Sequence, residues 1–113
     1  MNTVKILNTT ISVTSIVEVS NILNYESSLK VAICNTNTVV RSYRNDQLSN
    51  IINSFDIKTP DGFPIAKSSS ILYKNGQSRV DGYKVLLTTI NDGLSKNTSH
   101  YFYGSEDLVM KKM

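Results

Sequence analysis

The sequence of 113 residues predicts an α/β fold with a mainly parallel sheet and flanking helices. Three observations lead to this prediction. Segments of strand character alternate with segments in which apolar residues recur at helical spacing. Turn-forming pairs such as Asn75-Gly76 and Asp92-Gly93 separate several of these segments. Hydrophobic residues make up 40% of the chain and charged residues 19%, which is compatible with one small globular core.

The first half of the chain predicts a strand, a helix, a strand and a second helix. Residues 4–13 are rich in β-branched side chains and predict an extended segment. The sequence SIVE at residues 15–18 fits a capping box at the start of a helix. The apolar run Val31–Cys34 is typical of a buried parallel strand, and residues 35–38 are all credible N-caps for the helix that follows. Apolar residues at helical spacing predict that this helix continues to Phe55.

The second half of the chain continues the alternation. Residues 55–59 predict a brief strand, whereas residues 65–73 stay ambiguous because consecutive serines interrupt their pattern. Residues 83–94 carry apolar side chains at helical spacing. The aromatic residues within 99–103 predict a strand, and residues 106–113 predict the first turns of a helix. Because a helix after a strand needs a further strand to cover it, the sequence predicts an incomplete Rossmann-like arrangement, the front part of a longer fold.

The composition excludes several classes of protein. One cysteine and one histidine can supply neither an internal disulfide nor the four ligands of a structural zinc site. The sequence has no apolar run of the ~18 residues that a membrane-spanning helix requires, and its N-terminus does not fit a secretory signal. The net charge of +3 is weak for a nucleic-acid-binding surface. We therefore expect a cytoplasmic protein that has no structural zinc site and does not bind nucleic acid.

Three loops carry the residues best suited to chemistry. Asp61 follows a predicted strand between Pro60 and Gly62, where its carboxylate could take a proton from an incoming hydroxyl and Gly62 would let a ligand approach the backbone. Asn35 opens a helix, where backbone N–H groups could bind a phosphate or a sugar hydroxyl. The guanidinium of Arg79 could hold a diphosphate. Each residue also has a plainer interpretation. Asp61 could belong to a tight Pro-Asp-Gly turn, Asn35 could simply cap a helix, and Arg79 could be a solvated surface residue.

A series of short motifs gives the sequence a family resemblance. In chain order the motifs are Asn35, Tyr43-Arg44-Asn45, Ile52-Asn53-Ser54, Asp56, Pro60-Asp61-Gly62-Phe63-Pro64, Arg79-Val80-Asp81-Gly82 and His100-Tyr101-Phe102-Tyr103-Gly104-Ser105. The specificity lies in the ordered series rather than in any one motif. In this series the chain resembles the bacterial glycosyltransferase family named for the WecB, TagA and CpsF proteins.

The resemblance implies an inverting glycosyltransferase. Such an enzyme moves a sugar, of the N-acetylmannosamine type or a related hexose, from a UDP-sugar to a polyprenyl-diphosphate-linked glycan at the inner face of the cell membrane. Its products are capsule, teichoic acid or other cell-surface polysaccharides. By the same resemblance Asp61 is the general base, Asn35, Gly62 and Arg79 bind substrate, and Arg79 is the partner for diphosphate charge. The resemblance implies no bound metal or other cofactor.

Two departures from the family pattern limit what carries over. Ile33 stands where many members have a threonine, so the hydroxyl that would assist the base or the acceptor is missing. Members are considerably longer, so we expect residues 1–113 to be the N-terminal part of a single α/β domain, without transferase activity alone. Peripheral membrane contact is expected only for a full-length form, and a homo-oligomer is compatible with the sequence. Two other functions stay open: a non-catalytic module that binds a nucleotide or a sugar, and a decayed remnant.

Overall fold

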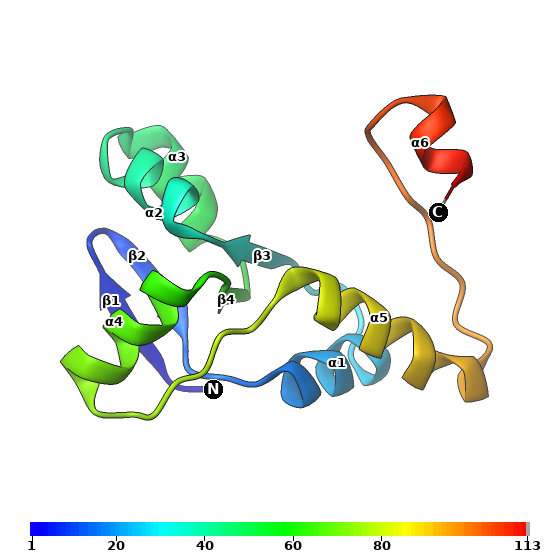
Figure 1. Cartoon of the computed structure of the whole chain (residues 1–113), viewed down its shortest axis with the longest axis horizontal. Coiled ribbons are helices and arrows are strands. Elements are labelled where there is room, and N and C mark those ends of the chain that lie inside the picture. The colour runs from blue at the N-terminus through cyan, green and yellow to red at the C-terminus, as the bar shows by residue number, and fades with distance from the viewer. Residues whose placement is uncertain (113) are drawn as a thin grey trace.

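The computed structural model describes residues 1–112 and confirms the α/β class, with helices that flank short strands (Figure 1). In chain order the elements are β1 (Thr3–Ile6), β2 (Thr9–Ser12), α1 (Ile16–Tyr25), β3 (Val31–Cys34), α2 (Thr36–Tyr43), α3 (Asp46–Asn53), β4 (Ile57–Pro60), α4 (Phe63–Tyr73), α5 (Gly82–Gly93), the 3-10 helix η1 (Leu94–Lys96) and α6 (Asp107–Lys111). The segment predicted as ambiguous is thus the helix α4, which has Pro64 in its first turn.

The strands form two small sheets that lie next to each other. β3 and β4 are parallel, in a register that pairs Cys34 with Pro60 at their carboxyl ends. The predicted single extended segment 4–13 is wrong, because β1 and β2 fold back on each other as an antiparallel hairpin. The hairpin turns at Leu7, which has a φ of 53°. Its second strand lies against β4, where the Lys58 N–H donates to Ser12 Oγ at 3.0 Å.

The helix predicted to continue to Phe55 is instead two helices, α2 and α3. Asn45 causes the break, because its side chain accepts a hydrogen bond from the Leu48 N–H at 3.0 Å and so caps a new helix. The capping predicted for the first helix is confirmed: Ser15 Oγ accepts from the Glu18 N–H at 3.2 Å. Local capping chemistry therefore sets both helix starts.

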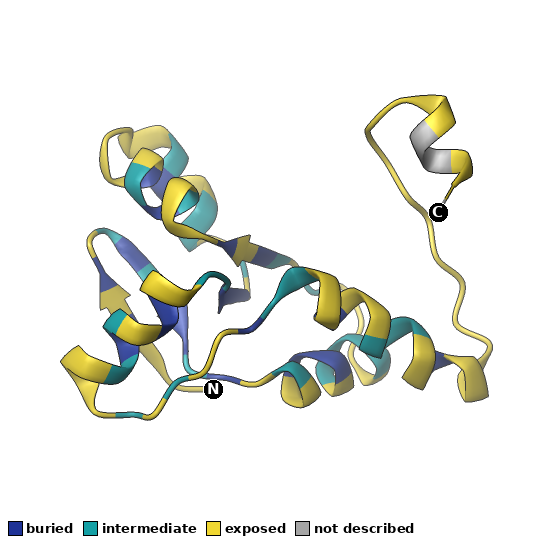
Figure 2. Cartoon of the chain, in the orientation of Figure 1, coloured by how far each residue is buried: buried dark blue, intermediate teal, exposed yellow. Residues whose placement is uncertain are grey.

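The predicted strand at residues 99–103 is wrong. These residues have no regular structure, and Tyr101 and Tyr103 are exposed. In Figures 1 and 2 the segment leaves the helices after η1 and runs without regular structure to α6. Its Phe102 lines a pocket together with Tyr83, Leu86, Leu87 and Ile90 of α5. A strand needs a neighbour to pair with, and none of the described strands lies beside this segment. The helix predicted at residues 106–113 is present as α6, and residue 113 lies outside the described residues.

Buried side chains form two clusters, one on each side of the parallel pair. The first joins the hairpin, β3, α2 and α4 through Val4, Ile6, Ile11, Ala32, Cys34, Val39 and Ile65. The second joins α1, β4, residue 80 and α5 through Val19, Ile57, Val80 and Val85. Because neighbouring strand residues point to opposite faces, β3 contributes Ala32 and Cys34 to the first cluster and Val31 packs against the second. The carboxyl ends of β3 and β4 are therefore supported from both faces.

Candidate active site

The carboxyl ends of β3 and β4 bring together the loops that the sequence singles out. Asn35 follows β3, and Asp61 and Gly62 follow β4. The Asp61 N–H donates to the Cys34 carbonyl at 3.1 Å, which continues the pairing of the two strands by one residue. A Cβ added to Gly62 would lie 3.9 Å from both Cα and Cβ of Asn35. The two loops are thus in van der Waals range, as parallel strand ends predict.

Gly62 makes the turn from β4 into α4. Its φ of +100° and ψ of 137° lie in a region that side chains with a Cβ rarely adopt. Its carbonyl accepts the Ala66 N–H at 3.2 Å, the first hydrogen bond of α4. The Asp61 N–H also approaches the Thr59 carbonyl, at 2.9 Å. Pro60 thus ends β4, Asp61 and Gly62 connect it to α4, and the Asp61 side chain is left to make other contacts.

The Asp61 carboxylate joins two further segments. Arg79 Nε donates to Oδ1 at 3.2 Å, and the Gly82 N–H, the first of α5, lies 3.4 Å from Oδ2. Arg79 also approaches Asp81 Oδ2, at 3.9 Å. The Asp61 side chain is 17% exposed and that of Arg79 52%, so the pair lies at the surface with the carboxylate on its inner side. Each carboxylate oxygen can accept two hydrogen bonds, and each has one donor within 3.5 Å here. Asp61 can thus still accept a hydrogen bond from a ligand.

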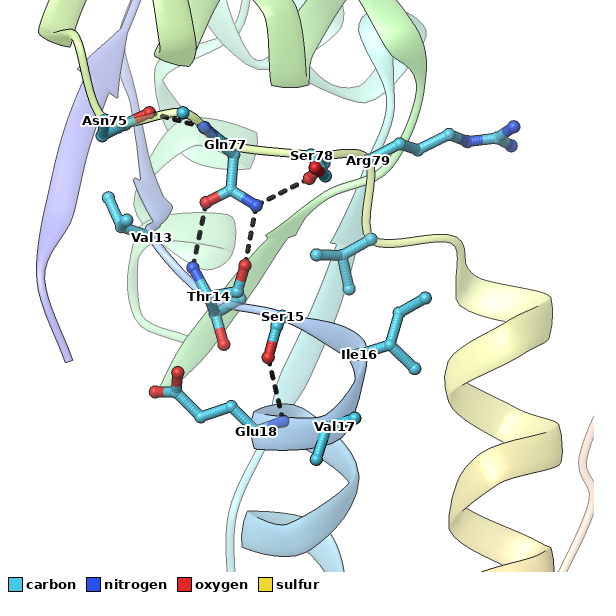
Figure 3. A pocket seen from close by; sticks show the side chains of 12 residues that line it. Val13, Thr14, Ser15, Ile16, Val17, Glu18, Asn75, Gln77, Ser78 and Arg79 are labelled. Carbon is cyan, nitrogen blue, oxygen red and sulfur yellow. Dashed lines mark hydrogen bonds between the residues drawn. The ribbon is translucent and has the colours of Figure 1, made fainter.

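The chain on either side of Arg79 is held in place by hydrogen bonds, and Figure 3 shows those of Gln77 on one side. On one side, the Gln77 amide pairs with the backbone of Thr14: Nε2 donates to its carbonyl at 2.7 Å, and Oε1 accepts its N–H at 3.0 Å. On the other side, the Val80 N–H donates to the Pro60 carbonyl at 3.0 Å. These contacts fix the path that carries Arg79 to Asp61.

A cavity of about 550 Å³ lies between residues 13–18 and 75–80, and Asp61 does not line it. Arg79 contributes to its wall, but in Figure 3 the guanidinium extends away from Gln77. We therefore centre the candidate site on Asp61 rather than on this cavity, because the groups able to move a proton or hold an anion gather at the strand ends.

Asn35 caps α2, as the plainer interpretation predicts. Its Oδ1 accepts from both the N–H and the hydroxyl of Thr38, at 2.9 and 3.0 Å. Asn35 is exposed, and within residues 1–112 its side-chain nitrogen makes no hydrogen bond. The cap fixes the side chain in a position from which this nitrogen can donate to a bound hydroxyl.

Ile33 also lies at the candidate site. A Cβ added to Gly82 would meet the Ile33 side chain at 3.1 Å and Asp61 Oδ2 at 3.5 Å. The aliphatic side chain therefore lines the site next to the carboxylate. The Gly82 N–H is a contact that the sequence analysis did not assign, and the only signal for it was the turn-forming pair Asp81-Gly82.

Neither a metal-binding cluster nor a helix that could span a membrane is found in the part of the chain that the structure describes. Among residues 1–112, no three His, Cys, Asp or Glu side chains gather closely enough to hold a metal ion. In the same part of the chain, each helix is too short or too polar to cross a membrane.

The candidate site thus combines the carboxylate of Asp61, the guanidinium of Arg79 and the N-termini of α2 and α5. Enzymes of the α/β class use sites of this type, at the ends of parallel strands, for anionic substrates. The model of the Glycosyl transferase WecG/TagA/CpsF family matches residues 4–113. The chain belongs to this family of glycosyltransferases, and the resemblance found from the motifs is confirmed. No curated protein matches the chain.

Proposed function

We propose that the protein takes part in the inverting transfer of a hexose, of the N-acetylmannosamine type or a related sugar, from a UDP-sugar to a polyprenyl-diphosphate-linked acceptor. Residues 1–113 would form the N-terminal part of one glycosyltransferase domain, at the inner face of the cell membrane, in the synthesis of a cell-surface polysaccharide. The observation that carries the proposal is the Asp61 carboxylate at the strand ends, in contact with Arg79 and with the N-terminus of α5.

In the proposed reaction Asp61 acts as the general base. The acceptor hydroxyl gives its proton to the carboxylate, and its oxygen forms a bond to the anomeric carbon of the donor sugar. The bond between that carbon and the diphosphate oxygen breaks on the opposite face, and its electron pair leaves with UDP. The configuration at the anomeric carbon is thereby inverted, and one carboxylate is enough for the step.

The neighbours of Asp61 have supporting roles in this proposal. Arg79 provides positive charge for a diphosphate: its Nε donates to Asp61 and its Nη2 lies 3.9 Å from Asp81 Oδ2, and the side chain as a whole is half exposed. Asn35 donates from its free amide to a sugar hydroxyl. Gly62 lets the substrate approach the backbone closely. Ile33 lines the site where a threonine hydroxyl is common in the family, and so favours a less polar part of the acceptor.

The test is the Asp61→Asn variant, studied in the full-length protein. With a UDP-sugar and a prenyl-diphosphate-linked sugar, we expect the rate of UDP release to fall by about 10²- to 10⁴-fold, because an amide cannot take the proton. The matched control is Asp56→Asn, at the opposite end of β4, where the carboxylate accepts the Lys30 N–H at 2.8 Å. A rate within a few-fold of wild type for Asp61→Asn would show that Asp61 is not the base. UDP-sugar binding without any transfer would favour the non-catalytic module.

A further inference from the structure

The backbone that follows Arg79 is anchored at the end of β4. The Val80 N–H donates to the Pro60 carbonyl at 3.0 Å, and Val80 itself is 1% exposed, in the second core cluster. Pro60 directly precedes Asp61, so this anchor determines where the chain after Arg79 lies relative to the carboxylate. An anchor on one side alone leaves the backbone before Arg79 free to rotate about it.

The backbone that precedes Arg79 depends on the side chain of Gln77. Its Nε2 donates to the Thr14 carbonyl at 2.7 Å and to the Ser78 carbonyl at 2.6 Å, while its Oε1 accepts the Thr14 N–H at 3.0 Å. Figure 3 shows the amide between these two segments of the chain. Both N–H donors and the carbonyl oxygen of the side chain therefore have partners, which gives the amide a single satisfied orientation.

Thr14 is a firm attachment point for Gln77. It is 9% exposed and lies two residues after Ser12, the last residue of β2. Ser12 Oγ in turn accepts the Lys58 N–H of β4 at 3.0 Å. The contact of Gln77 thus leads back to β4, as the contact of Val80 does, and β4 is the strand that Asp61 follows.

We propose that Gln77 is a positioning residue of the candidate site: by holding the backbone before Arg79 on Thr14, it keeps the Arg79 guanidinium on Asp61. Charge alone does not fix this geometry, because the Arg79 side chain is 52% exposed and an exposed ion pair contributes little when both partners are mobile. Asp81 Oδ2, 3.9 Å from Nη2, also offers the guanidinium a second partner.

The consequence for activity rests on the proposed function. A guanidinium whose Nε is held on Asp61 presents its outer N–H groups to an anionic substrate in a fixed direction. The substrate then does not have to order the arginine when it binds, and this lowers the entropic cost of binding. Gln77 contributes to this step through Arg79.

The experiment measures the hydrogen exchange of the Arg79 Nε–H by NMR in the isotope-labelled whole chain, with Arg79→Lys to identify the signal. In the wild type we expect slower exchange than at the exposed Arg41 and Arg44, because the Asp61 carboxylate accepts this hydrogen. Gln77→Met keeps the length of the side chain and removes its amide. We expect it to accelerate the exchange at least about fivefold, while the amides of β4 stay protected.

The matched control is Asn53→Leu. The Asn53 amide makes the same kind of double contact, since it donates to the Asn8 carbonyl at 2.8 Å and accepts the Thr10 N–H at 2.9 Å, but it holds the hairpin instead of residues 75–80. This variant loses comparable hydrogen bonds to the backbone and leaves the exchange at Arg79 unchanged. The comparison therefore separates positioning of the guanidinium from a general loss of stability.

A milder variant, Gln77→Asn, keeps an amide but shortens it by one methylene group, and it decides the question if Gln77→Met does not fold. We expect a smaller acceleration in the same direction. The proposal is overturned by unchanged exchange in the Gln77 variants, by an equal acceleration in Asn53→Leu, or by wild-type exchange at Arg79 as fast as at Arg41.

Inorganic pyrophosphate, titrated into the same samples, tests the proposed function separately. We expect it to bind several-fold more weakly to Gln77→Met than to the wild type, and equally well to Asn53→Leu. A protected Arg79 Nε–H in a wild-type chain that does not bind pyrophosphate, together with its loss in Gln77→Met, would support the role of Gln77 and contradict the assignment of Arg79 to a diphosphate.

Discussion

Cys34 ends β3 one residue before Asn35 and is buried in the first core cluster. Burial raises the pKa of its thiol from 9.0 to about 11, and the Lys58 ammonium opposes this increase in part. The folded protein therefore keeps the thiol proton at pH values where the unfolded chain loses it. The stability of the folded protein therefore decreases when the pH rises above the pKa that the Cys34 thiol has in the unfolded chain.

We predict that the contribution of Cys34 to stability is complete below about pH 9 and is lost as the pH rises toward about 11, by roughly 3 kcal/mol in total. The free energy of unfolding in urea, measured at pH 8 and pH 10.5, tests this. Lysines and tyrosines also titrate in this range, so the informative quantity is the difference between wild type and Cys34→Ala. The prediction is wrong if the two proteins lose stability equally between these pH values.

Much of the candidate site could be predicted from single residues and their order. Asp61, Gly62 and Asn35 each follow a segment with strand character, and parallel strands place such loops at one edge. The approach of Arg79 to Asp61 could not be predicted in this way. It depends on the Gln77 amide, which pairs with Thr14 across a sequence separation of 63 residues. A single glutamine in a polar loop has no pattern that reveals such a partner.

For the helices, apolar periodicity alone led to a wrong prediction, although the sequence also contained the capping residue that divides α2 from α3. The apolar spacing continues across the junction between α2 and α3, so it predicts one helix. Asn45 ends this continuity by capping the Leu48 N–H. The strands predicted at residues 31–34 and 55–59 are present as β3 and β4. The strand predicted at residues 99–103 failed for a different reason, since a strand depends on a distant partner. Residues 99–103 have a strand-like composition but no neighbouring strand among the described elements.

We predict that Asn45→Ala destabilises the protein by about 1 kcal/mol, because the N-terminus of α3 loses the acceptor for its Leu48 N–H. Asn45→Asp retains the acceptor and restores most of this stability, which separates the effect of capping from that of side-chain size. Urea unfolding followed by circular dichroism measures both changes. Equal stability of the alanine and aspartate variants would contradict the capping role.

At the scale of the whole molecule, the β1–β2 hairpin is joined to the parallel strands β3 and β4. Two buried clusters lie on opposite faces of β3 and β4, so the two strands connect the helices α1 and α5 with the hairpin and α4. On the hairpin side, Ser12 Oγ accepts the Lys58 N–H, a backbone donor of β4 that is itself buried. One side chain thus provides the hydrogen bond that a further strand would otherwise supply.

We predict that Ser12→Ala destabilises the protein by about 1–3 kcal/mol, because the Lys58 N–H is left buried without an acceptor. The same loss of pairing exposes this amide to local opening, so its hydrogen exchange accelerates together with that of the neighbouring β4 amides. Ser27→Ala, at an exposed loop position, serves as the control and changes neither quantity. If Ser12→Ala lowers stability but leaves exchange at Lys58 unchanged, the hairpin supports the core by packing alone and the hydrogen bond does not join the two sheets.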